Sequence, residues 1–314
     1  MTFMCEIQPL MDGPWSEEKS IRIEELLRIA AETGFSGVDM IAGTIEAMGP
    51  DRVRKILNDK NLKLNSIICI GELADPSGRD EEVQAPYIRA IDAAVFFDCP
   101  HLMLVPGSSN GSADTSAIVQ ALERRFRNIT QAAADKGISC MIEDDPDLFA
   151  GICAQADVRH MLEAVPGLKL VYDSANMIVA GEDPVQYYEG LHEYVIHTHI
   201  KDMAVCEDPS AYRNPGSDGR YYANVPHGKG LVDFDALFGS FRKYGYDGVL
   251  SLEYVPDESL SVRDDIERVY KMTASLVCKY NVGINEVGLI PVLQTQPYED
   301  VWRKLKELGT DSVE

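Results

Sequence analysis

The sequence lacks any apolar run near the roughly 20 residues that a membrane-spanning helix needs. Its start, residues 1–6, has no basic segment followed by an apolar one, so we expect no signal peptide. Its seven cysteines are scattered and include no Cys-x-x-Cys pair, which indicates reduced thiols and excludes a disulfide framework or a zinc ribbon. Together these absences favour a cytoplasmic protein that does not enter a membrane.

Positive charge is also scarce. The chain carries 29 Lys and Arg against 51 Asp and Glu, a net charge of −22. A field of this sign repels phosphate backbones, and no basic stripe offsets it, so we do not expect nucleic-acid binding. The acidic composition favours a neutral small molecule or a cation as ligand. The alternative is that the acidic surface only provides solubility.

No internal repeat or low-complexity segment is present, and no Gly-x-Gly-x-x-Gly follows the first apolar run. The missing fingerprint disfavours the alternative fold, an open dinucleotide-binding sheet. Instead, eight short apolar runs alternate with amphipathic helical stretches. The predicted strands are residues 4–8, 37–41, 63–70, 102–106, 138–143, 169–173, 195–201 and 248–253. The predicted helices are residues 20–33, 50–60, 84–97, 114–136, 155–164, 184–190 and 233–244.

Eight strand–helix units predict an α/β fold of the (β/α)8 TIM-barrel type. We interpret residues 1–280 as one such barrel, closed by a helix at about 262–280. Residues 281–314 are then a C-terminal extension, with a short charged helix at about 298–308. A polar insertion at about 203–230, after the seventh strand, is predicted to cover the site as a lid.

Four predicted strands end in metal-ligating residue types, namely Glu143, Asp173, His199 and Glu253. Since the carboxyl ends of barrel strands meet on one face, these residues predict one metal site. The bland alternative is a set of carboxylates that cap the following helices. Three carboxylates and one imidazole favour one divalent ion, with Mn²⁺ preferred and Mg²⁺, Co²⁺ or Zn²⁺ as alternatives.

Such an ion would leave two positions for a carbonyl oxygen and the neighbouring hydroxyl of a substrate, and would make the adjacent C–H more acidic. Glu143 and Glu253 are the predicted catalytic pair, because each can remove or return a proton. Epimerisation through an enediolate needs two such groups.

Further residues are candidates for substrate binding. His197 and Lys201 share one strand face with His199, although His197 also fits a core histidine and Lys201 a salt bridge to a ligand carboxylate. His227 stands beside two glycines, where substrate contact and plain exposure are alternatives. Trp15 follows the first strand and could stack on a sugar ring or an aryl group, or serve packing.

The order of these motifs resembles the xylose-isomerase-like TIM-barrel sugar isomerases and epimerases over about residues 5–275. The resemblance rests on Glu143, Tyr172-Asp173, His197-Thr198-His199-Ile200-Lys201-Asp202, Gly228-Lys229-Gly230-Leu231-Val232-Asp233-Phe234, Gly245-Tyr246-Asp247-Gly248 and Leu252-Glu253. It implies a barrel, the metal ligands Glu143, Asp173, His199 and Glu253, and two acid/base glutamates, as in the ketose 3-epimerases.

The chain departs from the family pattern at several positions. Asn176 and Asp145 stand where members often have histidines, Val205 where ketose epimerases have an arginine, and Lys229 where a Gly-Glu-Gly has its glutamate. The metal ligands are thus kept while the substrate contacts differ. We therefore add Asn176 and Asp145 to the predicted substrate-binding residues.

The leading hypothesis is a divalent-metal-dependent sugar isomerase or epimerase. The alternative is the catalytic subunit of a C-glycoside deglycosidase, a lyase that acts on 3-oxo-glycosides with a smaller partner. An endonuclease-IV-like enzyme would need three zinc ions and a basic groove, and a non-catalytic sugar-binding protein would not need an open metal position. We expect a sugar or glycoside as ligand, and either a homo-oligomer or a hetero-oligomer with a small subunit.

Overall fold

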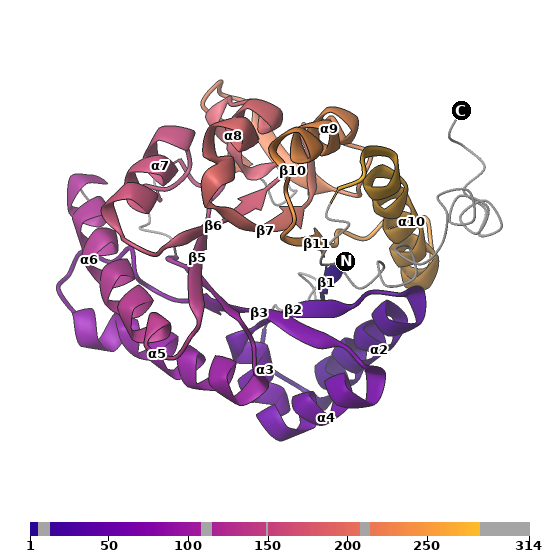
Figure 1. The fold of residues 1–314 in the computed structure, drawn as a ribbon, viewed down its shortest axis with the longest axis horizontal. Coiled ribbons are helices and arrows are strands. Elements are labelled where there is room, and N and C mark those ends of the chain that lie inside the picture. Colours follow the sequence, from indigo (N-terminus) through magenta and orange to yellow (C-terminus); the bar gives the residue numbers. More distant parts are fainter. Residues whose placement is uncertain (6–12, 108–114, 149, 208–213, 283–314) are drawn as a thin grey trace.

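The structure, a computed structural model, describes residues 1–5, 13–107, 115–148, 150–207 and 214–282. Eight parallel strands close into a barrel that helices surround (Figure 1). In order around the barrel the strands are β1 (Thr2–Met4), β11 (Val249–Glu253), β7 (Val195–Ile200), β6 (Lys169–Asp173), β5 (Ser139–Glu143), β4 (His101–Val105), β3 (Lys63–Ile70) and β2 (Gly37–Ile41). The predicted TIM barrel is confirmed.

The helices cover the outside of this barrel. They are α2 (Glu17–Thr33), α3 (Ala42–Met48), α4 (Pro50–Lys60), α5 (Asp80–Phe97), α6 (Thr115–Ala134), α7 (Gln155–Ala164), α8 (Pro184–Leu191), α9 (Phe234–Tyr244) and α10 (Val262–Tyr280), with short 3-10 turns η1 (Asn176–Ala180) and η2 (His192–Tyr194). Side chains of Ser16, Asp183 and Ser261 cap helix starts by accepting backbone N–H groups. Among the described residues, no helix has the length and apolar character to cross a membrane.

Two apolar layers hold the barrel together, because alternate residues of each strand point inward and outward. The outward side chains pack against the helices in one large cluster. The inward ones form a smaller cluster inside the barrel, made of Ile41, Ile68, Met103, Met141 and Val171. This inner cluster fills the barrel below its carboxyl end, so the polar inward residues at that end meet above an apolar floor.

Some predicted boundaries were wrong. The first strand was expected at residues 4–8, but β1 is Thr2–Met4, since Thr2 and Met4 pair with Ser251 and Glu253 of β11. Residues 6–8 lie outside the described part of the chain. Helix α3 was not predicted, because its first residue follows β2 directly and Ile41 at its N-cap offers no capping side chain.

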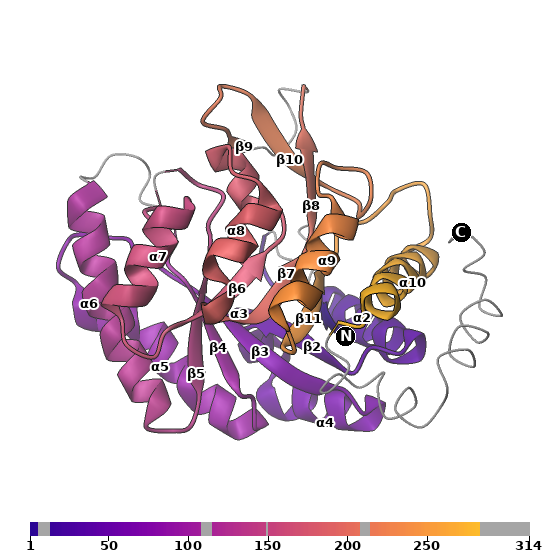
Figure 2. The same cartoon turned by 45° about the horizontal axis from the view of Figure 1, so that its top comes forward.

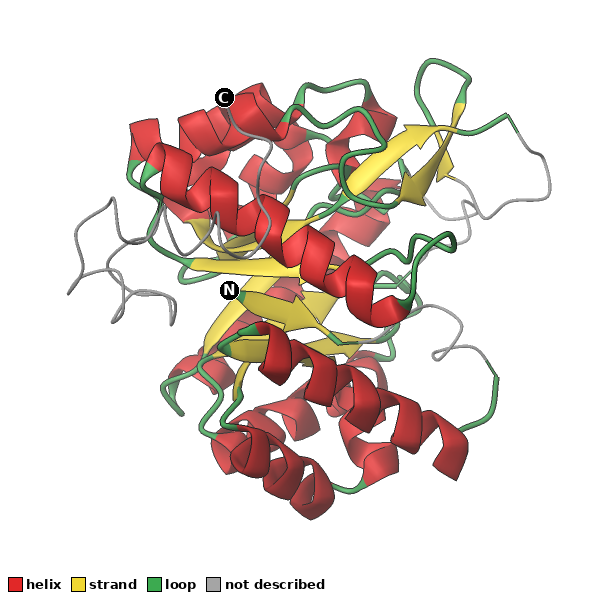
Figure 3. Cartoon of the chain, turned by 90° about the vertical axis from the view of Figure 1, so that its right-hand side faces the viewer, coloured by secondary structure: helices red, strands yellow, loops and turns green. Residues whose placement is uncertain are grey.

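The insertion after β7 forms a small antiparallel sheet of β8 (Asp202–Val205), β9 (Asn214–Pro215) and β10 (Tyr221–Val225). It stands apart from the barrel strands, above α8 and α9 in Figure 2, and is also visible in Figure 3. Its described residues are thus strands and turns, while residues 208–213 lie outside the description. The C-terminal segment from residue 283, including the helix predicted at 298–308, is likewise not described.

Candidate metal centre

Four strands bring the predicted ligands into one cluster at the carboxyl end of the barrel. The donor atoms of Glu143, Asp173, His199 and Glu253 all lie within 4.8 Å of one another. His199 Nδ1 is 2.5 Å from Glu143 Oε1 and 3.7 Å from Glu253 Oε2. The cluster forms because β5, β6, β7 and β11 are neighbours in the barrel and each places its last inward side chain at the same end.

The donor set fits one divalent ion. Ligand distances of about 2.1 Å place the donors of an octahedral ion roughly 3–4 Å apart, so the observed spacing needs little adjustment. Asp173 Oδ1 accepts hydrogen bonds from the backbone N–H groups of Ala175 and Asn176, at 2.7 and 2.8 Å. Its Oδ2 accepts no hydrogen bond from the described residues, but it faces the cluster and forms an ion pair with Lys201.

The four side chains of the cluster differ in their exposure to solvent. The side chains of Glu143 and Glu253 are 17% and 22% exposed, while Asp173 and His199 are buried. A bound ion would therefore be anchored on the buried pair and reached from the glutamate side.

The pKa values of the cluster reflect crowded negative charge. Burial raises the pKa of Asp173 to about 7, although the nearby Lys201 ammonium lowers it. Burial alone would lower the pKa of His199, but the adjacent Glu143 carboxylate raises it to about 9. Burial likewise disfavours ionised Glu253, yet Lys201 and His199 hold its pKa below the usual value. Three carboxylates thus share two cationic groups, and a divalent cation would neutralise them more fully.

Lys201 is part of this cluster. Its Nζ lies 3.3 Å from Asp173 Oδ2 and 3.3 Å from Glu253 Oε2, and its side chain is almost fully buried. Burial acts to lower the pKa of Lys201, but the carboxylates of Asp173, Glu253 and Glu143 outweigh it and raise the pKa. The sequence suggested a salt bridge from Lys201 to a carboxylate of the predicted ligand set, and salt bridges to Asp173 and Glu253 are present. Its contact with substrate stays a prediction.

Asp39 is a buried acid that the sequence analysis missed. Its Oδ2 lies 2.9 Å from His197 Nε2 and 3.8 Å from His199 Nε2. Asp39 is within hydrogen-bonding distance of His197 and lies on the Nε2 side of His199, while Nδ1 of His199 faces Glu143 and Glu253. Asp39 stands in the middle of a predicted strand, whereas the sequence analysis considered only acids at strand ends. A charged residue inside an apolar run could have marked it as a candidate site residue. His197 therefore faces Asp39, and its substrate role is untested.

Two other predicted substrate residues have protein partners. The Asn176 side-chain amide donates to the backbone oxygen of Asp144 at 2.7 Å. Asp145 Oδ1 accepts from the backbone N–H of Asp147, and burial raises the pKa of Asp145 to about 6. Both residues support the segment that follows β5, and their contact with substrate remains a prediction.

His227 and Trp15 also contact protein groups. His227 is buried, contrary to the exposed alternative, and its Nε2 lies 2.6 Å from the backbone oxygen of Ile200. Its loop is tied to the barrel by Asp202, whose carboxylate accepts the backbone N–H groups of Gly228 and Gly230. Trp15 is partly buried and donates from Nε1 to Ser20 Oγ at 3.1 Å. Neither observation tests a role in substrate binding.

Comparison with known proteins identifies the family of the chain. Residues 27–274 match the model of the family described as xylose isomerase-like TIM barrel. Inosose dehydratase from Lacticaseibacillus casei is 21% identical over 173 residues, which cover 53% of each chain. Fructoselysine 3-epimerase from Shigella flexneri is 23% identical over 266 residues, 78% of this chain and 91% of that protein.

A solved structure has the same fold. A xylose isomerase-like TIM barrel protein from Mycobacterium smegmatis, in complex with magnesium, is 20% identical and superposes with a TM-score of 0.60. The superposition covers 85% of this chain and 92% of that one. The chain is thus similar in sequence to an epimerase and a dehydratase, and its match spans only about half the length of the inosose dehydratase.

Proposed function

Because the chain belongs to the xylose isomerase-like TIM barrel family, we propose that it is a divalent-metal-dependent enzyme that moves a proton next to a carbonyl of a sugar or polyol. The observation that carries this proposal is the cluster of three carboxylates and one imidazole within 4.8 Å, with two partly exposed glutamates. A protein that only binds sugars has no use for acid/base groups at a metal site.

The leading reaction is isomerisation or epimerisation. A divalent ion bound by Glu143, Asp173, His199 and Glu253 would polarise the substrate carbonyl and acidify the adjacent C–H. One of the two glutamates, as its carboxylate, removes the proton from that carbon, and the other, in its protonated form, returns one on the other face. Lys201, whose Nζ donates to Glu253 Oε1, can donate a further hydrogen bond to a substrate oxygen.

Mn²⁺ or Mg²⁺ is the proposed ion. Oxygen-rich donor sets suit these hard cations better than they suit Zn²⁺. The magnesium found with the similar Mycobacterium smegmatis protein supports the same class of ion. Metal analysis after chelation and reloading should return about one ion per chain, and His199→Ala should remove it. His160→Ala is the matched control, because His160 is exposed and, within the described part of the chain, pairs with Glu123.

The reaction is tested by incubating the metal-loaded protein with ketoses in deuterated water. Deuterium incorporation next to the carbonyl, with formation of the epimer, is the expected result. Glu143→Gln and Glu253→Gln should each abolish epimer formation, and one of them should still allow exchange. If neither exchange nor product appears with any ketose, the epimerase proposal is wrong.

Elimination is the second candidate, because the chain is similar to inosose dehydratase. Elimination begins with the same proton removal but then expels a group from the next carbon, either water or the aglycone of a 3-oxo-glycoside. Release of such a group without epimer would favour elimination. Activity that requires a smaller second subunit would identify the C-glycoside deglycosidase type, and light scattering would distinguish that assembly from a homo-oligomer.

A further inference from the structure

The carboxyl end of the barrel is divided into two chemically different halves. In β5, β6, β7 and β11 the last inward side chains are Glu143, Asp173, His199 and Glu253, the metal cluster. In β1 to β4 the last inward side chains are all apolar. They are Met4, Ile41, Ile70 and Val105, which we call the apolar half-ring.

The strand register places the half-ring residues inside the barrel. Ile70 pairs with Val105, and two residues earlier Ile68 pairs with Met103, both of which belong to the inner cluster. Since alternate residues share one face, Ile70 and Val105 continue this inward row to the end of the strands. Met4 and Val105 pack against the same inner cluster, and Ile41 belongs to it.

Ile70 is unusually exposed for an inward residue of a barrel strand. Its exposed fraction is 51%, whereas Ile68 below it is 2% exposed. An exposed inward isoleucine means that no side chain of the described residues covers it at the end of the barrel. It therefore offers apolar surface on the side away from the metal cluster.

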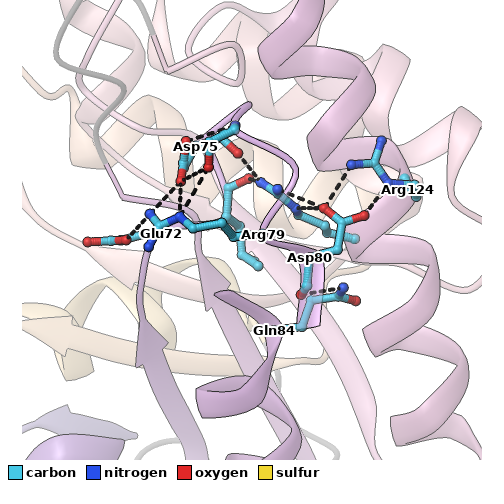
Figure 4. Close-up of polar contacts among 9 residues, drawn as sticks. Glu72, Asp75, Arg79, Asp80, Gln84 and Arg124 are labelled. Atoms are coloured by element: carbon cyan, nitrogen blue, oxygen red, sulfur yellow. Dashed lines mark hydrogen bonds and ion pairs between the residues drawn. The ribbon is translucent and has the colours of Figure 1, made fainter. Parts of the chain in front are cut away.

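Buried and charged side chains fix the loop that follows Ile70, so the exposed position of Ile70 is held by the surrounding structure. Arg125 is fully buried in α6 and donates to the backbone oxygens of Leu73 and Asp75. Arg79 joins Glu72 and Asp75 in one ion-pair network (Figure 4). Glu72, two residues after Ile70 in the sequence, is thus engaged with an arginine.

The loops after β3 and β4 also pack backbone to backbone. A Cβ atom on Gly107 would lie 2.1 Å from the backbone oxygen of Gly71, and Gly107 has φ of +75°. Only glycine permits this approach. The ends of β3 and β4, which carry Ile70 and Val105, are therefore fixed side by side.

We infer that the substrate carries an apolar group, such as an aryl or alkyl substituent, on the side opposite its metal-binding oxygens. This inference rests on the proposed metal-dependent function. The interior of an eight-stranded barrel is only wide enough for side chains, so a ring held at the metal cluster also reaches the opposite half. Hydroxyl groups placed against the apolar half-ring would lose hydrogen bonds to water without replacement, while an apolar group gains by leaving water.

Hydroxamates are suitable probes, because they chelate divalent ions through two neighbouring oxygens. Binding of acetohydroxamate, benzohydroxamate and a four-carbon polyhydroxy hydroxamate to the Mn²⁺-loaded protein would be measured by calorimetry, with the metal-free protein as blank. Benzohydroxamate should bind at least about tenfold more tightly than the polyhydroxy probe, the order expected for burying one ring face. Ile70→Asn should remove this preference and leave acetohydroxamate within about twofold.

Ile88→Asn is the matched control, because Ile88 is a similarly exposed isoleucine, 42% exposed, but belongs to helix α5 on the outside of the barrel. Equal or tighter binding of the polyhydroxy probe to the unaltered protein would overturn the inference, and this comparison does not depend on how the variants fold. Equal weakening of all probes by Ile70→Asn would also overturn it. If no hydroxamate binds in a metal-dependent way, the proposed function itself fails.

Discussion

Replacing Lys201 by methionine should have opposite effects on the metal-free and metal-loaded protein. Its ammonium lies 3.3 Å from Asp173 Oδ2, and at an effective dielectric constant of about 20 such a contact is worth roughly 5 kcal/mol. Removing one partner of a buried ion pair typically costs about 3–5 kcal/mol of unfolding free energy. Because Glu253 is partly exposed and screened, we expect a loss of about 3 kcal/mol in the metal-free protein.

A divalent ion supplies the charge that the variant lacks. In saturating Mn²⁺ the loss from Lys201→Met should fall to about 1 kcal/mol or less, since the carboxylates are then neutralised by the ion. The loss of unfolding free energy caused by Lys201→Met is thus about 2 kcal/mol smaller with Mn²⁺ than without it. By linkage, this difference corresponds to roughly thirtyfold tighter Mn²⁺ binding by the variant than by the unaltered protein. The ammonium is in this sense a competitor of the metal.

The assay is urea denaturation of both proteins with chelator and with Mn²⁺, together with direct titration of Mn²⁺. Lys229→Met is the matched control, because Lys229 pairs with Asp257 but is 53% exposed. It should cost less than about 1 kcal/mol and leave Mn²⁺ affinity unchanged. Weaker Mn²⁺ binding by Lys201→Met, or the same loss of stability with and without the ion, would refute this electrostatic reasoning.

Three further outcomes are expected. Arg125→Met should lower the free energy of unfolding by about 3–5 kcal/mol in denaturation experiments, because the Arg125 guanidinium is buried in an ion pair with Asp80. Arg124 also pairs with Asp80 but is half-exposed, so Arg124→Met should lower it by about 1 kcal/mol or less. Burial lowers the pKa of His101 to about 4, so between about pH 4 and 6.5 the unfolded chain binds one more proton than the folded chain. The free energy of unfolding therefore rises with pH in this range. His101→Gln should reduce the slope of unfolding free energy against pH by up to about 1.4 kcal/mol per pH unit in denaturation experiments. Gly107→Ala should lower the melting temperature, since the added Cβ meets a backbone oxygen and positive φ disfavours alanine.

The sequence alone was enough to predict the barrel. Eight apolar runs separated by amphipathic stretches require parallel strands with helical crossovers, and closing such a sheet buries both faces of every strand. The four strand-end ligands were predictable for the same reason, because parallel strands present their carboxyl ends on one side. Boundaries were less predictable where local signals were weak. α3 begins at Ala42 without a capping side chain, and β1 is set by its pairing with β11 and not by its own residues.

Other features depend on which strands are neighbours in space. Asp39 lies in β2 and His197 in β7, and they are joined by the closure of the barrel, which no local pattern encodes. The apolar half-ring is a comparable case, because Ile70 looks like an ordinary core residue in the sequence and proves half exposed at the end of its strand. The residue types and their order along each strand thus determine the fold and the metal ligands. Closure of the barrel decides which side chains face the same space, because contacts between distant strands depend on register around the whole sheet.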